Sequence, residues 1–563
     1  MFRSLAFCER KKIVTDMEKK VYGKIISSLE KVLPEKEPTL EIKNGSMFLN
    51  EEYHLQLAYY SDSDDMGLFP MSVKVEGALS ACVHCYNEHL NPSTVVWRPC
   101  DDDYVSTSAC LIPDALLEFD KMSYNLPAKQ WRAVWVSIKL PEGFQAGVYE
   151  TSFSLVTSEG ETVIKLPFSL EVIGAKLPKN PLRLSNWMHY DCIAHEHHVK
   201  PFTKAYYKVF ESYLKVYVES GFNMLLTPLF TPPLDTEIGL VRTTAQLVGV
   251  TVEKGGYTFD FSGLKYFLDF VLSRGIEYIE FSHLFTQWGG KACPKIMAKV
   301  NGRAKQIFGW ETASDDEGYV KFLHAFLKEL VAFIDEEGLR GRCYFHLTDE
   351  PFEDHLATYT KCSEIVREYI GDMPIMDALS HYDFYKHGLL DIPVVYTPAY
   401  TEFEPHGLKD MMVYNCCIPA TEYYSNRFIY SPSYRMRILG FQLYETGVQG
   451  YLHWGYNFYN SWRSITLINP WANTDSAGRF PSGDGFMVYP IHGGACASIR
   501  CMMSKESVQD YTAMCLLESF IGREKAVELL HEWGLKGYNT YERGGEALIN
   551  FREKINQEIK KYL

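Results

Sequence analysis

The stretch RCYFHLTDEPF, residues 342–352, ends a short apolar run with two acidic residues, Asp349 and Glu350. The apolar and aromatic residues before this pair have the composition of a buried strand. Pro351 has no N–H to donate to a sheet, so the strand must stop at the acidic pair. The C-terminal ends of the strands carry the catalytic groups of (β/α)8 barrels. The stretch therefore predicts a strand end that presents two carboxylates, although the same pair could simply cap the following helix.

From residue 183 onward, strand-like runs alternate with helical patterns, and the run that ends in Asp349 and Glu350 is the fourth of eight. The eight runs are residues 183–189, 222–227, 276–284, 343–347, 374–379, 394–397, 412–416 and 450–454. Eight strands with helices between them predict an α/β protein with a closed (β/α)8, TIM-like barrel. A hairpin around Gly255 and Gly256 is predicted as an insertion.

The segment before the barrel has a different pattern. Short alternating or β-branched runs, separated by turns, fill residues 41–172 and predict a β-sandwich. A Pro- and Lys-containing linker at 178–181 marks its end. We therefore predict three domains: residues 1–177, with a helix at 16–33 before the sandwich; the catalytic barrel at 178–495; and a helical extension at 496–563 packed on the barrel.

Charge and composition disfavour several classes of partner. The 563 residues carry a formal net charge of −15 without a long basic run, which disfavours nucleic acid and anionic membranes. We find no run of 18 apolar residues and no signal peptide, so we expect a cytoplasmic protein without membrane insertion. Aromatic residues make up 14% of the chain. Their ring faces can stack on sugars as well as fill cores, so this composition is compatible with a carbohydrate partner.

Two clusters approach the spacing of metal sites. Cys82 and Cys85 form a C-x-x-C pair, with Cys100 beyond, but no second matching pair follows. The run 195–198, His-Glu-His-His, lacks the i, i+4 spacing of a helical zinc site. We therefore expect reduced structural thiols, no metal and no other cofactor.

Polar and aromatic residues gather at the other predicted strand ends. A barrel that bound an apolar ligand would not need so many, so their convergence on one face predicts a polar binding site. The candidates are His189 and Asp191 at the first strand, His283 at the third, Asp377 on the fifth, Tyr396 near the sixth, Tyr414 and Asn415 on the seventh, and Trp454 and Asn457 at the eighth.

An ordered series of motifs resembles glycoside hydrolase family 123. Residues 135–172 resemble the accessory domain of that family, and the HLTDEP run at 346–351 resembles its catalytic strand end. Farther on, aromatic, Asn-Pro-Trp and Gly-Asp-Gly motifs between residues 451 and 511 follow in the order of the family. The chain departs from the pattern at 504–507, where family members often carry Arg-Asp-Gly. The resemblance covers most of the chain, from about residue 131 onward.

The resemblance implies a retaining exo-glycosidase that removes terminal β-linked N-acetylgalactosamine by substrate-assisted catalysis. Glu350 would be the acid/base, and Asp349 would orient the acetamide of the sugar. A retaining enzyme with its own nucleophile needs two carboxyls about 5–5.5 Å apart across the scissile bond. Neighbours on a strand point to opposite faces and fit this poorly, whereas a 2-acetamido sugar supplies its own nucleophile.

Further roles follow from the same resemblance. Tyr396 or Tyr414 would hydrogen-bond the acetamide oxygen, and Trp454 and Trp471 would stack on the sugar or wall the acetamide methyl group.

Two other hypotheses stay open. The first is a glycosidase of other sugar specificity with a second, distant carboxylate such as Asp191, Glu280 or Asp377. The second is a carbohydrate-binding protein without turnover. The sequence leaves open the galacto or gluco configuration of the sugar, the aglycone and the oligomeric state.

Overall fold

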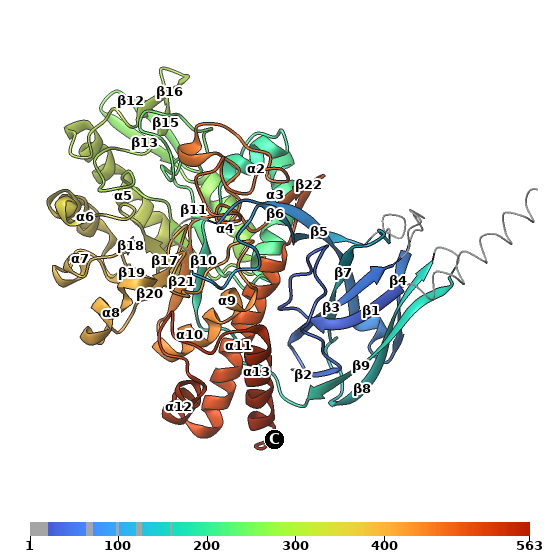
Figure 1. Cartoon of the computed structure of the whole chain (residues 1–563). Coiled ribbons are helices and arrows are strands. Elements are labelled where there is room, and N and C mark those ends of the chain that lie inside the picture. The colour runs from blue at the N-terminus through green and yellow to red at the C-terminus, as the bar shows by residue number, and fades with distance from the viewer. Residues whose placement is uncertain (1–20, 63–70, 97–100, 120–125, 158–159) are drawn as a thin grey trace, which may run out of the picture. The chain divides into compact units, whose positions relative to one another are not determined.

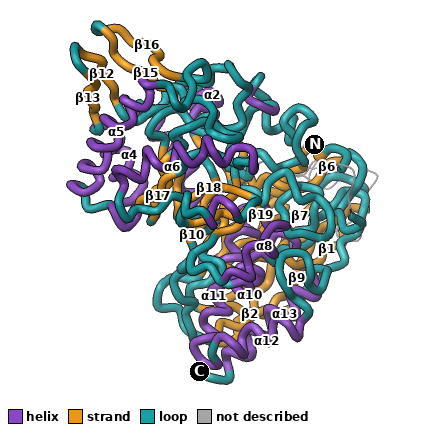
Figure 2. Tube along the Cα trace, turned by 90° about the vertical axis from the view of Figure 1, so that its left-hand side faces the viewer, coloured by secondary structure: helices purple, strands orange, loops and turns teal. Residues whose placement is uncertain are grey.

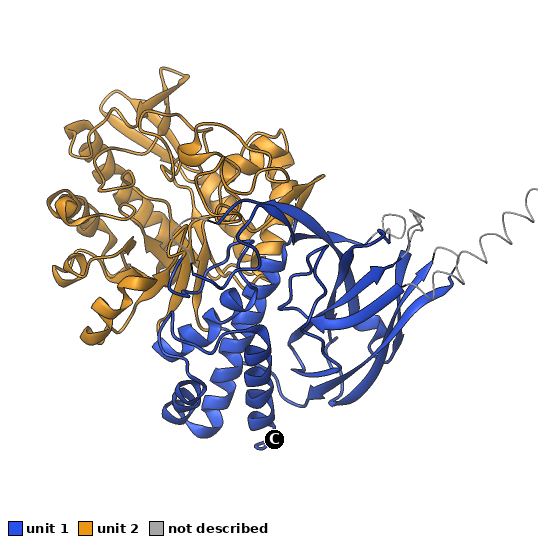
Figure 3. Cartoon of the chain, viewed as in Figure 1, with its two compact units in different colours: residues 1–180, 421–446, 496–563 blue, residues 181–420, 447–495 orange. Residues whose placement is uncertain are grey.

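The computed structural model describes residues 21–62, 71–96, 101–119, 126–157 and 160–563. The chain forms two compact units (Figure 3). Unit 1 contains residues 1–180, 421–446 and 496–563, and unit 2 contains residues 181–420 and 447–495. Residues 421–446, which lie inside the segment predicted as the barrel domain, therefore group with the N-terminal and C-terminal segments.

Unit 2 is built on an eight-stranded parallel sheet in the order β17-β14-β11-β10-β21-β20-β19-β18 (Figure 1). The strands are β10 (Arg183–Asn186), β11 (Met224–Thr227), β14 (Tyr278–Phe281), β17 (Cys343–Phe345), β18 (Met376–Leu379), β19 (Ile392–Tyr396), β20 (Met412–Tyr414) and β21 (Gly450–His453). A parallel bridge between Phe345 and Ile375 links the two ends of the sheet, which is thus nearly closed into a barrel. Seven of the strands fall within their predicted runs, β19 starts two residues before the run predicted at 394–397, and the predicted (β/α)8 class is confirmed.

Helices connect the barrel strands. They are α2 (Tyr190–Glu196), α3 (Lys204–Glu219), α4 (Ser262–Leu272), α5 (Glu317–Glu336), α6 (Leu356–Ile370), α7 (Asp383–Lys386) and α8 (Tyr400–Phe403), with 3₁₀ turns at Arg340–Arg342, Glu353–His355, Thr397–Ala399, Glu404–His406 and Trp462–Ser464. Side chains cap the N-termini of α3 and α5. Thr203 accepts from the Tyr206 N–H, and Asp316 accepts from the N–H groups of Gly318 and Tyr319.

An inserted four-stranded sheet has the order β13-β12-β15-β16. Its strands are β12 (Gly249–Glu253), β13 (Gly256–Asp260), β15 (Ile296–Val300) and β16 (Arg303–Phe308). The first two form the predicted hairpin. Strand β13 lies beside α5 (Figure 2), where Phe259 packs on Phe322 and Phe326. A short pair, β22 (Tyr489–Ile491) and β23 (Gly494–Cys496), completes the strands of the C-terminal half.

Unit 1 contains two antiparallel-rich sheets with the orders β1-β3-β7-β5-β6 and β2-β9-β8-β4. The strands are β1 (Val21–Ser27), β2 (Asn44–Phe48), β3 (Glu52–Ser61), β4 (Met71–Gly77), β5 (Val83–Ser93), β6 (Cys110–Glu118), β7 (Trp131–Lys139), β8 (Gly147–Thr157) and β9 (Thr162–Ile173), with a 3₁₀ turn at Ser80–Cys82. Alternate residues of both sheets, among them Leu55, Val134, Phe153 and Leu170, share one core. The predicted sandwich is therefore present.

The helix predicted at 16–33 is wrong over its described part, because β1 pairs with β3 there. Residues 16–20 lie outside the described residues. The β-branched Ile25 and Ile26 favour a strand. A Cβ on Gly23 would come within 2.9 Å of Ile164, so the strand needs a glycine at this close approach.

The helices of unit 1 are α9 (Tyr434–Arg437), α10 (Leu439–Thr446), α11 (Ile499–Ile521), α12 (Arg523–Trp533) and α13 (Gly545–Lys560). They bury a second core that includes Phe441, Leu517 and Phe551. Helix α10 approaches α11 so closely that a Cβ on Gly440 would lie 1.9 Å from the Ser507 carbonyl oxygen. The C-terminal helices thus pack on the helix that connects β20 to β21. No helix in the described part of the chain is long and apolar enough to cross a membrane.

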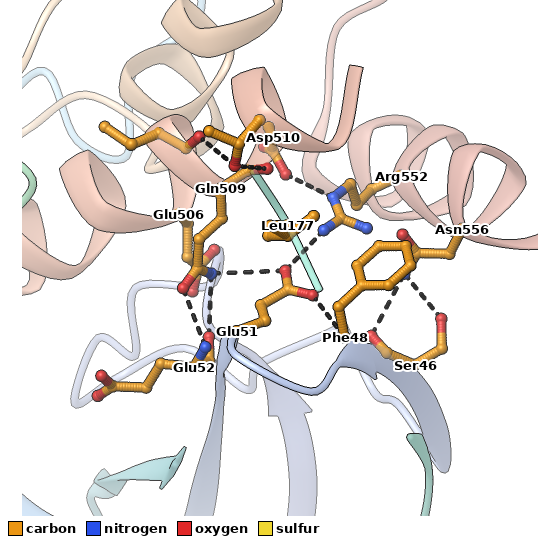
Figure 4. A network of polar contacts seen from close by, with 12 residues as sticks. Ser46, Phe48, Glu51, Glu52, Leu177, Glu506, Gln509, Asp510, Arg552 and Asn556 are labelled. Atoms are coloured by element: carbon orange, nitrogen blue, oxygen red, sulfur yellow. Dashed lines mark hydrogen bonds and ion pairs between the residues drawn. The ribbon is translucent and has the colours of Figure 1, made fainter. Parts of the chain in front are cut away.

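A buried network of charges joins the sandwich of unit 1 to its C-terminal helices (Figure 4). Arg552 donates to Glu51 at 2.6 Å and to Asp510 at 2.8 Å. Arg437 donates to Asp510 at 2.7 Å and to Glu506 at 2.5 Å. Because a buried charge without a partner is costly, these pairs fix how the helices dock on strands β2 and β3.

His54 of β3 belongs to this network and makes the stability of unit 1 depend on pH. Burial alone would lower the pKa of His54, but contacts with Glu506 at 2.8 Å and Glu52 at 3.3 Å raise it. Below a pH of about 6.5, the ordinary histidine value, the folded and unfolded chains both hold the proton and the ion pairs contribute fully. This contribution is lost as the pH rises through the raised pKa of the folded state.

We predict that His54→Gln costs most stability near pH 6 and progressively less toward pH 9. The measurement is the difference in free energy of unfolding between wild type and variant across this range. The exposed His84 on β5 serves as the matched control, and His84→Gln should change the unfolding free energy little at any pH. A His54→Gln effect that stays constant with pH would contradict the prediction.

Candidate active site

A pocket of about 190 Å³ lies among the carboxyl ends of the barrel strands. Its lining comes from strands β18, β20 and β21 and from the segments that follow β10, β11, β14, β17, β20 and β21. The lining residues are Trp187, Leu234, Asp235, Gln287, Trp288, Asp349, Glu350, Ala378, Tyr414, Cys416, Cys417, Leu452, Trp454, Trp462 and Phe480. This is the position at which barrels of this class carry their ligand sites.

Asp349 and Glu350 both line this pocket, although they are neighbours in sequence. Glu350 has φ 43°, a left-handed conformation that non-glycine residues adopt rarely. The Glu350 N–H donates to the Ala378 carbonyl at 3.1 Å, and the Trp288 N–H donates to the Asp349 carbonyl at 2.8 Å. The chain therefore turns at the end of β17, and the turn lets both carboxyls reach one cavity, which a regular strand would not allow.

The electrostatics of the two carboxyls are linked. Burial raises the pKa of Asp349, the nearby Glu350 raises it further, and the charge of His346 opposes this. Burial also raises the pKa of Glu350, while the Tyr414 hydroxyl, which donates to Oε1 at 2.7 Å, opposes the rise. Two buried carboxyls that repel each other lose their protons in separate steps. As the pH changes, the pair therefore passes through a state that holds one proton and one negative charge.

A buried histidine between two carboxylates lies beneath the acidic pair. His346 donates from Nδ1 to Asp377 at 2.8 Å and from Nε2 to Glu280 at 2.6 Å. Burial alone would lower the pKa of His346, but these two bonds raise it to about 10. Asp377 also accepts from the N–H groups of Leu347 and Thr348 at 3.1 and 3.3 Å. The cationic His346 and Asp377 therefore fix the backbone that leads into the acidic pair.

Several predicted site residues have structural contacts and do not line the pocket. Asp191 forms a bidentate ion pair with Arg242 at 2.6 and 2.9 Å. His189 donates to the Trp454 carbonyl at 3.0 Å, and its own N–H donates to Asn457 at 2.8 Å. Burial and the adjacent Arg242 lower the pKa of His189 to about 3. These residues hold the segment after β10 to the segments after β11 and β21 and do not line the cavity.

The other predicted residues divide between the pocket and its support. Tyr414 and Trp454 line the cavity, and the Trp454 Nε1–H donates to Asp484 at 3.0 Å. Outside the lining, Tyr396 packs on the Tyr414 ring at 5.6 Å between centroids, and Asn415 accepts from the Tyr451 hydroxyl at 2.7 Å. Trp471 donates to the Pro490 carbonyl at 2.9 Å. His283 stacks on His346 at 4.4 Å, and the buried Asp377 accepts from His346 at 2.8 Å.

The sequence analysis did not identify Asp235, Trp462 and Phe480, which lie in the long connections after β11 and β21. Asp235 is a third carboxyl in the pocket lining, and burial raises its pKa to about 6. The Arg463 N–H donates to it at 3.0 Å. The only signal was general, since long loops after barrel strands carry site residues. Together with Trp187, Trp288 and Trp454, the two aromatic side chains give the cavity walls that suit the C–H faces of a sugar.

One group of side chains has the composition of a metal site, namely His283, His346 and Asp377. Both ring nitrogens of His346 already donate to carboxylates, and its raised pKa keeps it protonated, whereas a metal ligand must be a neutral imidazole. Burial raises the pKa of Cys85 to about 12, and neither Cys82 nor Cys85 belongs to a group of three potential metal ligands among the described residues. Cys100 lies outside the described residues. The twelve described cysteines form no disulfide with one another.

Comparisons with known proteins identify a family. Residues 187–517 match the model of the glycoside hydrolase 123 catalytic domain. A solved family 123 glycoside hydrolase from Clostridium perfringens, described in terms of glycolipid glycan hydrolysis, superposes with a TM-score of 0.72 at 16% identity, covering 96% of this chain and 97% of the other. An endo-β-1,4-mannanase from Thermotoga petrophila gives a TM-score of only 0.34 at 13% identity over 59% and 77% of the two chains. No curated protein matches.

We predict that His346→Ala costs about 3–5 kcal/mol of folding free energy, because it leaves Glu280 and Asp377 buried without their cation. Denaturant unfolding of the variant measures the loss. The matched control is His324→Ala on α5, since His324 is 37% exposed, and its loss should stay within about 0.5 kcal/mol. Equal losses in the two variants would show that His346 is not a cationic support.

Proposed function

Because this chain belongs to glycoside hydrolase family 123, we propose that it removes terminal β-linked N-acetylgalactosamine with retention, using the acetamide of the substrate as the nucleophile. One observation carries the proposal: two adjacent carboxyls with raised pKa values share a pocket, and Tyr414 binds one of them. The glycan of a glycolipid is the proposed substrate class, by analogy with the Clostridium perfringens family member.

In the first step, Glu350 donates its proton to the glycosidic oxygen as the C1–O bond breaks. The acetamide carbonyl oxygen donates an electron pair to C1 and closes an oxazolinium ring. The leaving group departs as a neutral alcohol. In the second step, the Glu350 carboxylate takes a proton from water while the water oxygen bonds to C1 and the ring opens. Both substitutions invert C1, so the configuration is retained.

Asp349 is the proposed partner of the acetamide N–H. A negative charge there stabilises the positive charge that spreads over the acetamide in the transition state. His346 favours the ionised form of Asp349, and the Tyr414 bond shows that a hydroxyl donor reaches the same region. Of the two tyrosine candidates, Tyr414 is therefore preferred for the acetamide oxygen. The N–H of bound substrate would also favour ionised Asp349, so the shared proton would rest on Glu350.

The alternative of an ordinary two-carboxylate glycosidase has few candidates for its second group. Asp191 is paired with Arg242, and Glu280 and Asp377 are both bonded to His346. Among the pocket-lining residues, Asp235 remains. Its pKa of about 6 leaves it mainly ionised at neutral pH, so Asp235 is the carboxylate that this alternative would use as its second group. Family membership argues against the third hypothesis, a binding protein without turnover.

We predict that aryl 2-acetamido-2-deoxy-β-galactosides are hydrolysed and that the matching 2-hydroxy galactosides are not. A trifluoroacetamido substrate should react much more slowly, because fluorine withdraws electrons from the attacking carbonyl. The measurement is kcat/KM for the three substrates. Equal rates for the acetamido and trifluoroacetamido sugars, or a trapped glycosyl ester on a carboxylate, would favour the two-carboxylate alternative.

We predict that substitutions of the two carboxyls reduce the rate in different ways. Glu350→Gln should lose about 10²–10⁴ in rate with poor leaving groups and much less with dinitrophenolate, which needs no proton. Asp349→Asn should slow all acetamido substrates alike, because the attack step is common to them. Asp235→Asn is the matched control within the pocket and should show neither pattern. An identical loss for Glu350→Gln and Asp349→Asn, regardless of leaving group, would refute the assigned roles.

A further inference from the structure

Two loops beside the pocket carry a cluster of exposed apolar side chains. Unit 2 exposes eight large hydrophobic residues. Four of them lie in two short stretches, residues 238–241 and 465–467. They are Ile238, Val241, Ile465 and Leu467, with exposures of 69%, 59%, 56% and 52%. Scattered exposed hydrophobics need no explanation, but a group next to a ligand pocket does. We refer to these four residues as the apolar rim.

Hydrogen bonds hold the two loops of the rim together. The Glu237 N–H donates to the Arg463 carbonyl at 2.9 Å, and the Ser464 hydroxyl donates to the Asp235 carbonyl at 2.7 Å. Within each loop, turns fix the apolar residues: the Leu240 N–H donates to the Glu237 carbonyl, and the 460–467 segment closes as a small hairpin. The rim is therefore a preformed surface.

The same loops form part of the pocket wall. Asp235 precedes Ile238 by three residues, and Trp462 precedes Ile465 by three residues. Both Asp235 and Trp462 line the cavity. The rim is thus continuous with the pocket, so a substrate whose terminal sugar occupies the pocket has the remainder of its structure near these side chains.

The charged groups on the two loops are paired with each other or with neighbours. Arg463 donates to Glu237 at 2.9 Å, and its guanidinium also lies 4.2 Å from the centre of the Trp462 ring. Arg242 is engaged by Asp191. The exposed Arg479 also lies 5.2 Å from the centre of the Trp462 ring. The rim therefore presents aliphatic side chains beside paired charges and one exposed cation, whereas the whole chain carries −15. Such a surface suits uncharged amphiphiles, and the net charge disfavours anionic lipid.

We propose that the apolar rim contacts the lipid surface that anchors the substrate, so that the enzyme takes its sugar from a glycolipid at an electrically neutral membrane or micelle. This inference rests on the proposed function and names the non-sugar part of its substrate. Partial insertion of a few aliphatic side chains gives weak, reversible attachment driven by apolar burial. It raises the local concentration of the substrate without altering the chemistry in the pocket.

The test uses the full chain with the double substitution Ile238→Ser and Ile465→Ser. Its substrates are a glycolipid with terminal β-N-acetylgalactosamine in phosphatidylcholine vesicles and the same glycan released from lipid. We expect kcat/KM on the vesicles to fall by about tenfold, the effect of losing roughly 1.4 kcal/mol of apolar burial. The rate on the free glycan should not change. Cosedimentation with vesicles should weaken in parallel, and phosphatidylserine in the vesicles should weaken it for wild type as well.

The matched control is Val148→Ser with Leu111→Ser, two exposed apolar residues of unit 1 at 64% and 51% exposure. It should leave both rates and the cosedimentation unchanged. Equal losses of the rim variant on vesicles and on free glycan, or no loss on either, would overturn the inference. If wild type cleaves neither substrate, the proposed function fails. Cosedimentation of wild type and rim variant then still decides whether the rim binds lipid.

Discussion

The structure of the site depends on one buried cation, the imidazolium of His346, held between Glu280 and Asp377. Asp377 accepts at the same time from two backbone N–H groups just before the acidic pair, and the neighbouring Ala378 carbonyl accepts from Glu350. Strands β14, β17 and β18 are thereby locked at their carboxyl ends. Without the cation, two buried carboxylates would repel each other beneath a third, Asp349, whose ionisation the charge of His346 favours.

Four of the thirteen described non-glycine residues with positive φ lie around the same cavity. Asp235, Trp288, Glu350 and Arg463 all have positive φ, at 38°, 58°, 43° and 56°. Each such residue costs of order 1–3 kcal/mol and persists only where its surroundings hold it. Here the hydrogen bonds between loops supply that support. At Glu350 the left-handed turn brings two adjacent carboxyls into one pocket, which is the arrangement that the proposed mechanism requires.

The barrel could be predicted because buried parallel strands appear in the sequence as apolar runs between turn signals. Eight such runs with helices between them were enough to predict a closed barrel. The acidic pair could be located because Pro351 ends its strand. The hydrogen-bond and ion-pair partners of the candidate site residues could not be predicted. Asp191 looked like a ligand-facing carboxylate until Arg242, 51 residues away, was found to bind it. The helix predicted at 16–33 failed similarly, since only the partner strand β3 shows that residues 21–27 are extended.

The loops after β11 and β21 link the pocket to the apolar rim. Arg463 binds Asp235 through its N–H, Glu237 through its side chain and the Glu237 N–H through its carbonyl. One residue therefore positions a pocket-lining carboxyl, neutralises a loop charge and sets the spacing of the apolar rim. Loss of the Arg463 side chain would remove the second role while leaving both backbone bonds possible. The rim would then carry an unpaired Glu237, and a charge at a lipid-facing surface opposes insertion. The proposed chemistry at Asp349 and Glu350 and the proposed contact of the rim with lipid are thus separable, because the acidic pair follows β17 and the rim lies on the loops after β11 and β21.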